Sequence, residues 1–92
     1  MESLEIIKVR MGGAGDRAID SLSLKQMVRK LTAPALVNAR VFANVSISND
    51  LVIILTWFTS IPMPWGSELA RCLTQELKQY GLVDYSAWSD MD

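Results

Sequence analysis

Strict alternation of side chains between residues 36 and 47 limits how this chain can fold more than any other feature. One row of this stretch is entirely apolar: Val37, Ala39, Val41, Ala43, Val45 and Ile47. The other row mixes apolar and polar side chains: Leu36, Asn38, Arg40, Phe42, Asn44 and Ser46. Because successive side chains of a strand point to opposite faces of a sheet, the pattern predicts a strand over 36–47 with its apolar row on a hydrophobic core. The mixed row must face surroundings that accept both aromatic and charged groups.

Three further segments have the composition of strands. Alternation and β-branched residues predict a strand over residues 4–11, and the apolar run 51–58 predicts a strand covered on both faces. The Ser-Asn-Asp sequence at 48–50 predicts a hairpin turn before that run. Residues 82–91 alternate again and predict the last strand. The glycine-rich segment 12–16 is a predicted loop.

Two segments show the period of an amphipathic helix instead. In the first, apolar residues recur at positions i, i+3, i+4 and i+7, and Pro34 ends the helix that they predict. These residues are Leu24, Met27, Val28 and Leu31. The second helix is predicted from Ser67, a candidate N-cap, to Tyr80, with Gly81 as its C-terminal stop. Its apolar stripe contains Leu69, Leu73 and Leu77.

The predicted order of elements, βαββαβ, defines an α+β fold. Two crossover helices around a central hairpin give a ferredoxin-like sandwich, in which a four-stranded antiparallel sheet carries two helices on one face. We expect residues 1–92 to form a single domain, because a chain of 92 residues is too short to divide into two cores.

The other face of this sheet would have no helix to cover it. The mixed row of the strand 36–47 lies there, together with one side of the run 51–58 and with Trp88. Half of the residues are hydrophobic, which is a high content for so small a chain. A soluble monomer rarely exposes an apolar patch of this size. We therefore predict a homodimer in which the helix-free faces of two copies pack together and close an α+β barrel.

Charge and metal-ligating residues exclude several classes of function. The net charge is −1, with nine basic and ten acidic residues spread along the chain, so we expect no nucleic-acid binding. The chain contains no histidine, which excludes Ser-His and Cys-His catalysis, His-based zinc sites and a His-ligated haem. Cys72 is the only cysteine, which excludes an intrachain disulfide and a cysteine-cluster metal site. We expect neither a metal nor a cofactor.

The ends and the apolar runs of the chain bear on its location. The chain opens with Met-Glu rather than with a basic segment followed by an apolar one, which is the pattern of a signal peptide. Its longest apolar run, 51–55, is far shorter than the roughly 20 residues that cross a bilayer. We therefore expect a cytoplasmic protein with no membrane partner.

Eight residues are candidates for binding a ligand. They combine amides and a permanent cation with aromatic rings, and small-molecule sites use this mixture of placed polar groups and apolar surface. The candidates are Asn38, Arg40, Phe42, Asn44, Trp57, Trp65, Tyr85 and Trp88. Alternatively, the polar members form a network at the dimer axis and the aromatic members belong to the core and the interface. No catalytic residue can be assigned among them.

Two motifs carry a resemblance to a known family. They are "LVIILTWFTS" at residues 51–60 and "PWGSELARCLTQELKQYGLV" at residues 64–83. Together with the element order and the chain length, they make the chain similar to the dimeric α+β barrel superfamily, in particular to antibiotic-biosynthesis-monooxygenase-like domains. The resemblance implies a homodimer with a small cavity between sheet and helices in each subunit. Some members are cofactor-independent monooxygenases, whose cavities use Asn, Trp, Tyr and Arg side chains; Asn38, Arg40, Trp57 and Tyr85 supply these types here.

The resemblance favours a protein that binds a small aromatic or apolar ligand, or a cofactor-independent monooxygenase-like enzyme. Haem-degrading members use an Asn on the first strand and a His on the second helix, and this chain has neither, which disfavours haem chemistry. A non-catalytic structural or interaction module, or a ligand-sensing module, is the alternative. RNA recognition by the sheet is disfavoured, because the strand 4–11 has no aromatic residue for base stacking.

Overall fold

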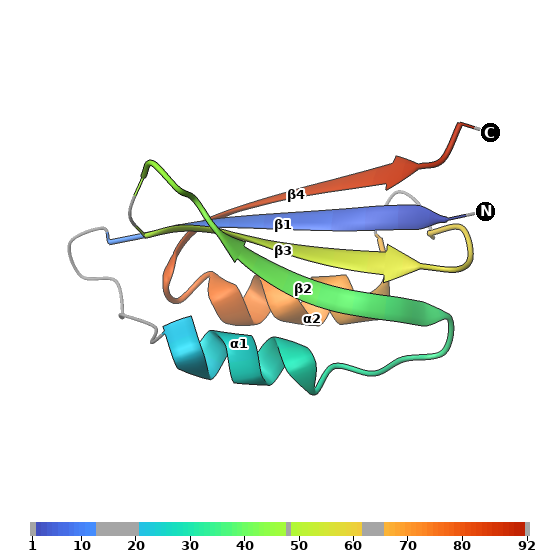
Figure 1. The fold of residues 1–92 in the computed structure, drawn as a ribbon, viewed down its shortest axis with the longest axis horizontal. Helices are drawn as coiled ribbons and strands as arrows, with labels where there is room; N and C mark the ends of the chain where they lie inside the picture. The colour runs from blue at the N-terminus through green and yellow to red at the C-terminus, as the bar shows by residue number, and fades with distance from the viewer. Residues whose placement is uncertain (1, 13–20, 48, 62–65, 92) are drawn as a thin grey trace.

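Six regular elements make up the described part of the chain. The computed structural model describes residues 2–12, 21–47, 49–61 and 66–91. In chain order the elements are β1 (Ser3–Met11), α1 (Ser21–Arg29), β2 (Leu36–Ala43), β3 (Asp50–Trp57), α2 (Glu68–Leu77) and β4 (Gly81–Ser89) (Figure 1). Most of the predicted loop 12–16 and the candidate residue Trp65 lie outside the described residues.

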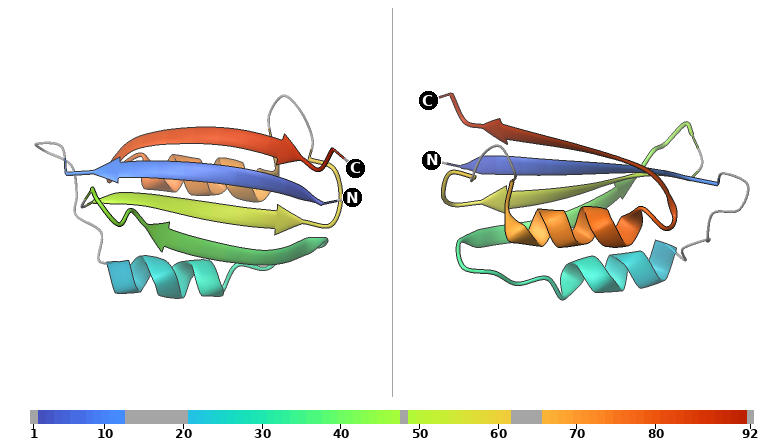
Figure 2. Two further views of the ribbon diagram at one scale, coloured as in Figure 1. Left: turned by 45° about the horizontal axis from the view of Figure 1, so that its top comes forward. Right: turned by 180° about the vertical axis from the view of Figure 1, so that it is seen from behind.

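The four strands form one antiparallel sheet in the order β2-β3-β1-β4. Both helices lie on the same side of this sheet, and the described residues place no helix on the opposite side (Figure 2). The element order, the strand order and the position of the helices confirm the predicted ferredoxin-like α+β fold. The central position of β1, between β3 and β4, means that its side chains meet residues from both halves of the chain.

The hydrophobic core lies between the sheet and the two helices. Alternate residues of β1 and β3 point into it, and both helices contribute residues at helical spacing. The core residues are Ile7, Val9, Leu24, Val28, Leu51, Ile53, Leu55, Trp57, Ala70, Leu73 and Leu77. Two polar residues of β1, Ser3 and Glu5, are buried on the same face. The core-facing row of β1 therefore contains a carboxylate among aliphatic side chains.

Strand β2 is shorter than the predicted strand 36–47, because a turn begins at Asn44. The side-chain Oδ1 of Asn44 accepts hydrogen bonds from the backbone N–H groups of Ser46 at 2.8 Å and Ile47 at 3.0 Å. An Asn side chain that caps the following backbone in this way ends a strand. The prediction that Val45 and Ile47 lie on the core was wrong, since Val45 is fully exposed and Ile47 is half exposed.

A bulge at the start of β2 also changes the predicted alternation. Leu36 lies opposite Trp57 and Asn38 lies opposite the next residue, Thr56, so that Val37 has no partner in β3. An extra residue in one strand reverses the faces on either side of it. Leu36 consequently packs against the core and Val37 is exposed, which is the reverse of the prediction. From Ala39 to Ala43 the alternation follows the predicted faces.

Helix α2 begins at the N-cap that the sequence indicates. The hydroxyl Oγ of Ser67 accepts a 3.1 Å hydrogen bond from the backbone N–H of Ala70, which satisfies one of the free donors of the first turn. The helix ends at Leu77 instead of Tyr80, and Gly81 is already the first residue of β4. A side chain at Gly81 would meet the backbone carbonyl of Arg10, so the close approach of β4 to β1 requires glycine there.

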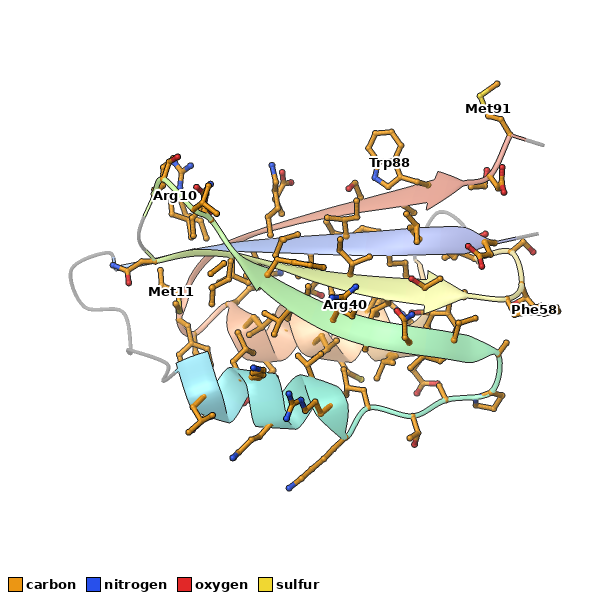
Figure 3. The ribbon with its side chains drawn as sticks, in the orientation of Figure 1. Arg10, Met11, Arg40, Phe58, Trp88 and Met91 are labelled. Atoms are coloured by element: carbon orange, nitrogen blue, oxygen red, sulfur yellow. The ribbon has the colours of Figure 1, made fainter. Side chains whose placement is uncertain are left out.

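The helix-free face carries a mixture of apolar and charged side chains. Its centre is formed by half-buried aliphatic residues of β1 and β3, namely Leu4, Ile6, Val52 and Ile54. Phe42 and Trp88 are exposed at its flanks, and Figure 3 shows Trp88 projecting away from the helices. One end of the face is charged, because Arg10 pairs with Asp50 at 3.9 Å. The structure thus leaves an apolar patch on the face that is predicted to form a dimer interface.

Candidate functional site

A buried carboxylate lies at the centre of the candidate site. Glu5 is fully buried, with 0% of its surface exposed, on the helix-covered face of β1. A carboxylate in this position is costly unless donors surround it, because burial removes the water that would otherwise solvate its charge. The structure supplies those donors from three other elements.

Four hydrogen bonds reach the two oxygens of Glu5. Oε1 accepts from the indole Nε1 of Trp57 at 2.7 Å and from the hydroxyl of Ser67 at 2.5 Å. Oε2 accepts from the backbone N–H of Ser67 at 2.9 Å and from the hydroxyl of Tyr85 at 2.5 Å. These bonds fill the usual acceptor capacity of a carboxylate. We call the four residues Glu5, Trp57, Ser67 and Tyr85 the Glu5 cluster.

The Glu5 cluster holds the start of α2 against the sheet. Ser67 donates to Glu5 through both its backbone and its side chain, while the same side chain accepts from Ala70 in the first turn of the helix. Gly66, directly before this N-cap, is buried with a positive φ of 79°. A Cβ at this position would meet the hydroxyl of Tyr85 and would lie 3.0 Å from Oε2 of Glu5. Only glycine allows the backbone to approach the cluster so closely.

Tyr85 acts in this cluster as a hydrogen-bond donor. Burial raises the pKa of its phenol above the ordinary value, and the hydrogen bond to Glu5 and the negative charge of that carboxylate raise the pKa further. A phenol that holds its proton this firmly donates a hydrogen bond at neutral pH and does not serve as a general base.

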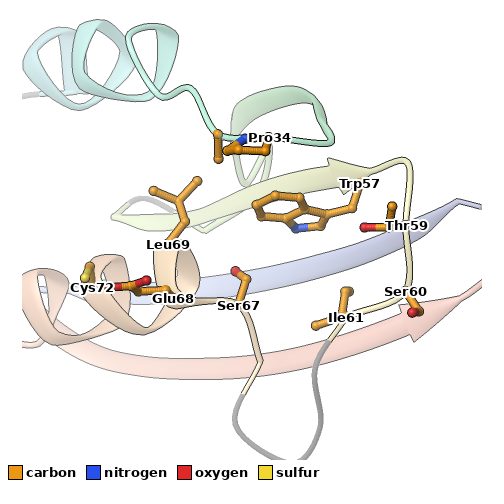
Figure 4. Close-up of a pocket in the computed structure, with 10 residues that line it drawn as sticks. Pro34, Trp57, Thr59, Ser60, Ile61, Ser67, Glu68, Leu69 and Cys72 are labelled. Carbon is orange, nitrogen blue, oxygen red and sulfur yellow. The ribbon is translucent and has the colours of Figure 1, made fainter.

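A pocket of about 530 Å³ adjoins the Glu5 cluster. Trp57 and Ser67 belong to both, and Figure 4 shows the indole of Trp57 lying among the pocket residues. The remaining lining residues come from the α1–β2 connection, the segment after β3 and the first turns of α2: Ala33, Pro34, Thr59, Ser60, Ile61, Glu68, Leu69 and Cys72. We call this cavity the Trp57 pocket. Its volume falls in the range of small-molecule sites.

The surface of the Trp57 pocket is mostly apolar with a few polar groups. Pro34, Ile61, Leu69 and the indole of Trp57 form apolar walls, whereas hydroxyls and one carboxylate supply polar contacts. Trp57 is only 7% exposed, and the hydrogen bond from its Nε1 to Glu5 fixes the orientation of the ring. The Glu5 cluster therefore positions a wall of the pocket.

The eight candidates from the sequence analysis do not form one site. Trp57 and Tyr85 lie on the helix-covered face and both contact Glu5. Asn38, Arg40 and Phe42 belong to the helix-free face, where the Arg40 guanidinium lies 4.9 Å from the centre of the Phe42 ring. The remaining described candidates also lie outside the cluster: Asn44 forms the turn after β2, and Trp88 donates from Nε1 to Ser86 Oγ on β4 at 2.9 Å.

Glu5 was not among the residues predicted to form a site. The signal was present, because Glu5 is in phase with Ile7 and Val9 in the alternation of the first strand. A carboxylate in the core-facing row of a strand needs hydrogen-bond donors, and Trp57, Ser67 and Tyr85 are residue types that provide them. Their convergence on Glu5 depends on the tertiary structure. Ser67 was identified only as a helix cap, and Glu68 was not a candidate.

Metal-binding clusters and membrane-spanning helices were both sought among the described residues. No three His, Cys, Asp or Glu side chains within 2–12, 21–47, 49–61 and 66–91 come close enough together to hold a metal ion. In the same part of the chain, neither helix has the length and apolar composition that crossing a membrane would require.

Comparison with protein-family models, with curated protein sequences and with solved structures found no match to this chain. The structure alone defines the class of this protein: a ferredoxin-like α+β fold with a buried carboxylate cluster beside a mostly apolar pocket.

Proposed function

We propose that this protein is a homodimeric α+β barrel protein, related to the antibiotic-biosynthesis-monooxygenase-like domains, that binds a small and largely apolar ligand in the Trp57 pocket. The observation that carries the ligand-binding proposal is the pocket itself: about 530 Å³ beside a fixed indole ring, between the sheet and the start of α2. Burying an apolar ligand there removes apolar surface from water on both partners, which favours binding.

Ligand binding has more support than oxygen chemistry. The resemblance associates oxygenase cavities with Asn, Trp, Tyr and Arg side chains. In this chain those types are divided, because Asn38 and Arg40 are on the helix-free face whereas Trp57 and Tyr85 contact Glu5 on the other. The proposal therefore places the ligand beside Trp57 and gives Arg40 a role in the dimer.

The ligand site is tested by filling the pocket. Ser60 is an exposed lining residue, so Ser60→Trp should block the pocket without disturbing the core. Isothermal titration calorimetry with 2-naphthylmethanol, a neutral bicyclic probe, should show binding to the natural protein and at least tenfold weaker binding to Ser60→Trp. Ser46→Trp introduces the same side chain at an exposed site outside the pocket and should bind like the natural protein. Equal binding by all three proteins would place the ligand elsewhere.

The dimer is supported by the apolar centre of the helix-free face. Ile6 and Ile54 are register partners in neighbouring strands and form the middle of this patch. A two-fold axis through the patch would bring it against the same patch of a second copy, which is the commonest arrangement in homo-oligomers. The pairing of Arg10 with Asp50 at one end keeps those charges partnered when water is excluded.

Sedimentation measurements test the dimer. The natural protein should sediment at micromolar concentration with twice the 10.2 kDa mass of the chain. Ile54→Lys places a charge in the proposed interface and should give a folded monomer, as judged by an unchanged far-ultraviolet circular dichroism spectrum. Val45→Lys makes a similar change at a fully exposed residue outside the sheet and should remain dimeric. A natural protein that sediments as a monomer would contradict the proposal.

A further inference from the structure

The charges around the Trp57 pocket have one sign. Glu68 is the only charged residue among the described residues that line it. A second carboxylate, Glu5, lies directly behind two of the lining residues, at 2.7 Å from Nε1 of Trp57 and 2.5 Å from Oγ of Ser67. The sequence contains no Lys or Arg between Arg40 and Arg71, so the segments that supply β3 and the start of α2 bring no positive side chain.

The N-terminus of α2 does not reverse this sign. A helix N-terminus is equivalent to about half a positive charge, carried by its free N–H groups. Here Glu5 accepts from the backbone N–H of Ser67, and the Ser67 hydroxyl accepts from Ala70. Glu68 lies in the first turn of the same helix, where it offsets the remaining partial charge. Two carboxylates against about half a positive charge leave the pocket negative.

The indole of Trp57 adds to the attraction for a cation. Its Nε1–H donates to a buried carboxylate, and donation to an anion increases the electron density of the ring. A positive group over the face of an indole is attracted by the ring quadrupole, more strongly where water is excluded. Trp57 is 7% exposed, so most of its ring is shielded from water by the protein.

From these observations, and on the basis of the proposed ligand-binding function, we infer that the Trp57 pocket selects apolar ligands that carry an ammonium group and rejects those that carry a carboxylate or phosphate. The apolar body of the ligand packs against Pro34, Ile61 and Leu69. The ammonium group lies between the indole of Trp57 and the carboxylate of Glu68.

Three probes with one ring system test the inference: 2-naphthylmethylamine, 2-naphthylmethanol and 2-naphthoic acid. In calorimetric titrations of the natural protein at pH 7, the amine should bind about tenfold more tightly than the alcohol. The acid should bind more weakly than the alcohol. Cys72 reports the place of binding, because it is the only cysteine of the chain and lines the pocket. The bound amine should slow its alkylation by iodoacetamide.

Two variants assign the selectivity to Glu68. Glu68→Gln should weaken binding of the amine about three- to fivefold and leave the alcohol unchanged. Glu76→Gln makes the same change at an exposed site on α2 that does not line the pocket, and it should leave both affinities unchanged.

The outcomes separate the inference from the proposed function. If the acid binds as tightly as the amine, or if Glu68→Gln and Glu76→Gln behave alike, the inference is overturned while the pocket remains a ligand site. If none of the three probes binds, both the ligand-binding proposal and the inference are overturned.

Discussion

The indole Nε1 of Trp57 donates a 2.7 Å hydrogen bond to Oε1 of Glu5, a residue 52 positions earlier in the chain. Trp57 is the register partner of Ser3, two residues before Glu5, so the two side chains form a diagonal pair on one face of the sheet. This pair connects the core to the pocket, since one partner is fully buried and the other forms a pocket wall. Changes at Glu5 should therefore affect both stability and ligand binding.

Replacing Glu5 by Gln should strongly destabilise the protein. The Gln amide nitrogen is a donor and cannot accept the hydrogen bonds that one carboxylate oxygen accepts now, so buried donors are left unpaired. We expect a loss of about 3 kcal/mol in the free energy of unfolding, measured by urea denaturation. Glu2→Gln makes the same change at an exposed residue and should cost less than about 0.5 kcal/mol. A loss below about 1 kcal/mol for Glu5→Gln would contradict the role given to the cluster.

Stability at high pH should depend on Tyr85. Its pKa is raised in the folded state, first by burial and then by Glu5, so folding favours the protonated phenol. This contribution to stability is complete below about pH 10, the ordinary pKa of tyrosine, and is lost as the pH rises beyond it. Tyr85→Phe should cost about 2 kcal/mol at pH 7, through the lost hydrogen bond to a carboxylate.

The pH dependence distinguishes this effect from a general loss of stability. Urea midpoints of the natural protein should fall more steeply above about pH 10 than those of Tyr85→Phe. Tyr80→Phe changes a tyrosine outside the Glu5 cluster and should keep the pH dependence of the natural protein. Parallel curves for the natural protein and Tyr85→Phe would contradict the prediction.

Replacing each of two glycines that have positive φ by alanine distinguishes the stability cost of backbone strain from that of a steric clash. Gly66→Ala must adopt φ near 79° and also places a Cβ against Tyr85 and Glu5. Gly12→Ala must adopt φ near 101°, but among the described residues its Cβ would meet only the side-chain Nδ2 of Asn49, at 3.4 Å. In urea denaturation, we expect a loss of about 1 to 2 kcal/mol for Gly12→Ala and at least about 2 kcal/mol more for Gly66→Ala. Equal losses would show that the cluster tolerates the added methyl group.

Arg40 should matter for the dimer and not for the pocket. It stacks on Phe42 on the helix-free face, opposite to the face that carries the Glu5 cluster. Arg40→Ala should weaken dimerisation about tenfold in sedimentation measurements, because an Arg and an aromatic ring at an interface contribute much of its binding energy. The affinity for 2-naphthylmethanol should not change. Arg29→Ala, at an exposed residue of α1, is the matched control. A shift in ligand affinity without a shift in dimerisation would reverse these assignments.

The order of elements could be predicted from the sequence because apolar residues recur with a different period in strands and in helices. Leu24 and Val28, at helical spacing, and Ala39 and Val41, at strand spacing, all pack on the core as their periods predict. The ferredoxin-like arrangement, with both helices on one face of a four-stranded antiparallel sheet, then followed from general rules of connection. The errors occurred where a local hydrogen bond or an extra residue interrupts a period, as at Asn44 and Val37.

The candidate site was harder to predict, because its members are far apart in the sequence. Trp57 and Tyr85 were identified by residue type, but their common partner Glu5 was not. The period of a strand shows which face a residue occupies and does not show which donors from other elements reach it. The alternation placed Arg40 on the helix-free face, but the strand 51–58 is apolar on both sides, so its sequence did not show that Trp57 faces the helices.

The spacing of the Glu5 cluster has a consequence for synthesis on the ribosome. The partners of Glu5 lie 52, 62 and 80 positions later in the chain. When only β1, β2 and β3 of the nascent chain have emerged from the ribosome, the donors of Ser67 and Tyr85 are still missing. Folding at that stage would bury the Glu5 carboxylate in the core with only part of its hydrogen bonds. We therefore expect the growing polypeptide to remain open until β4 has emerged, and then to fold in one cooperative step.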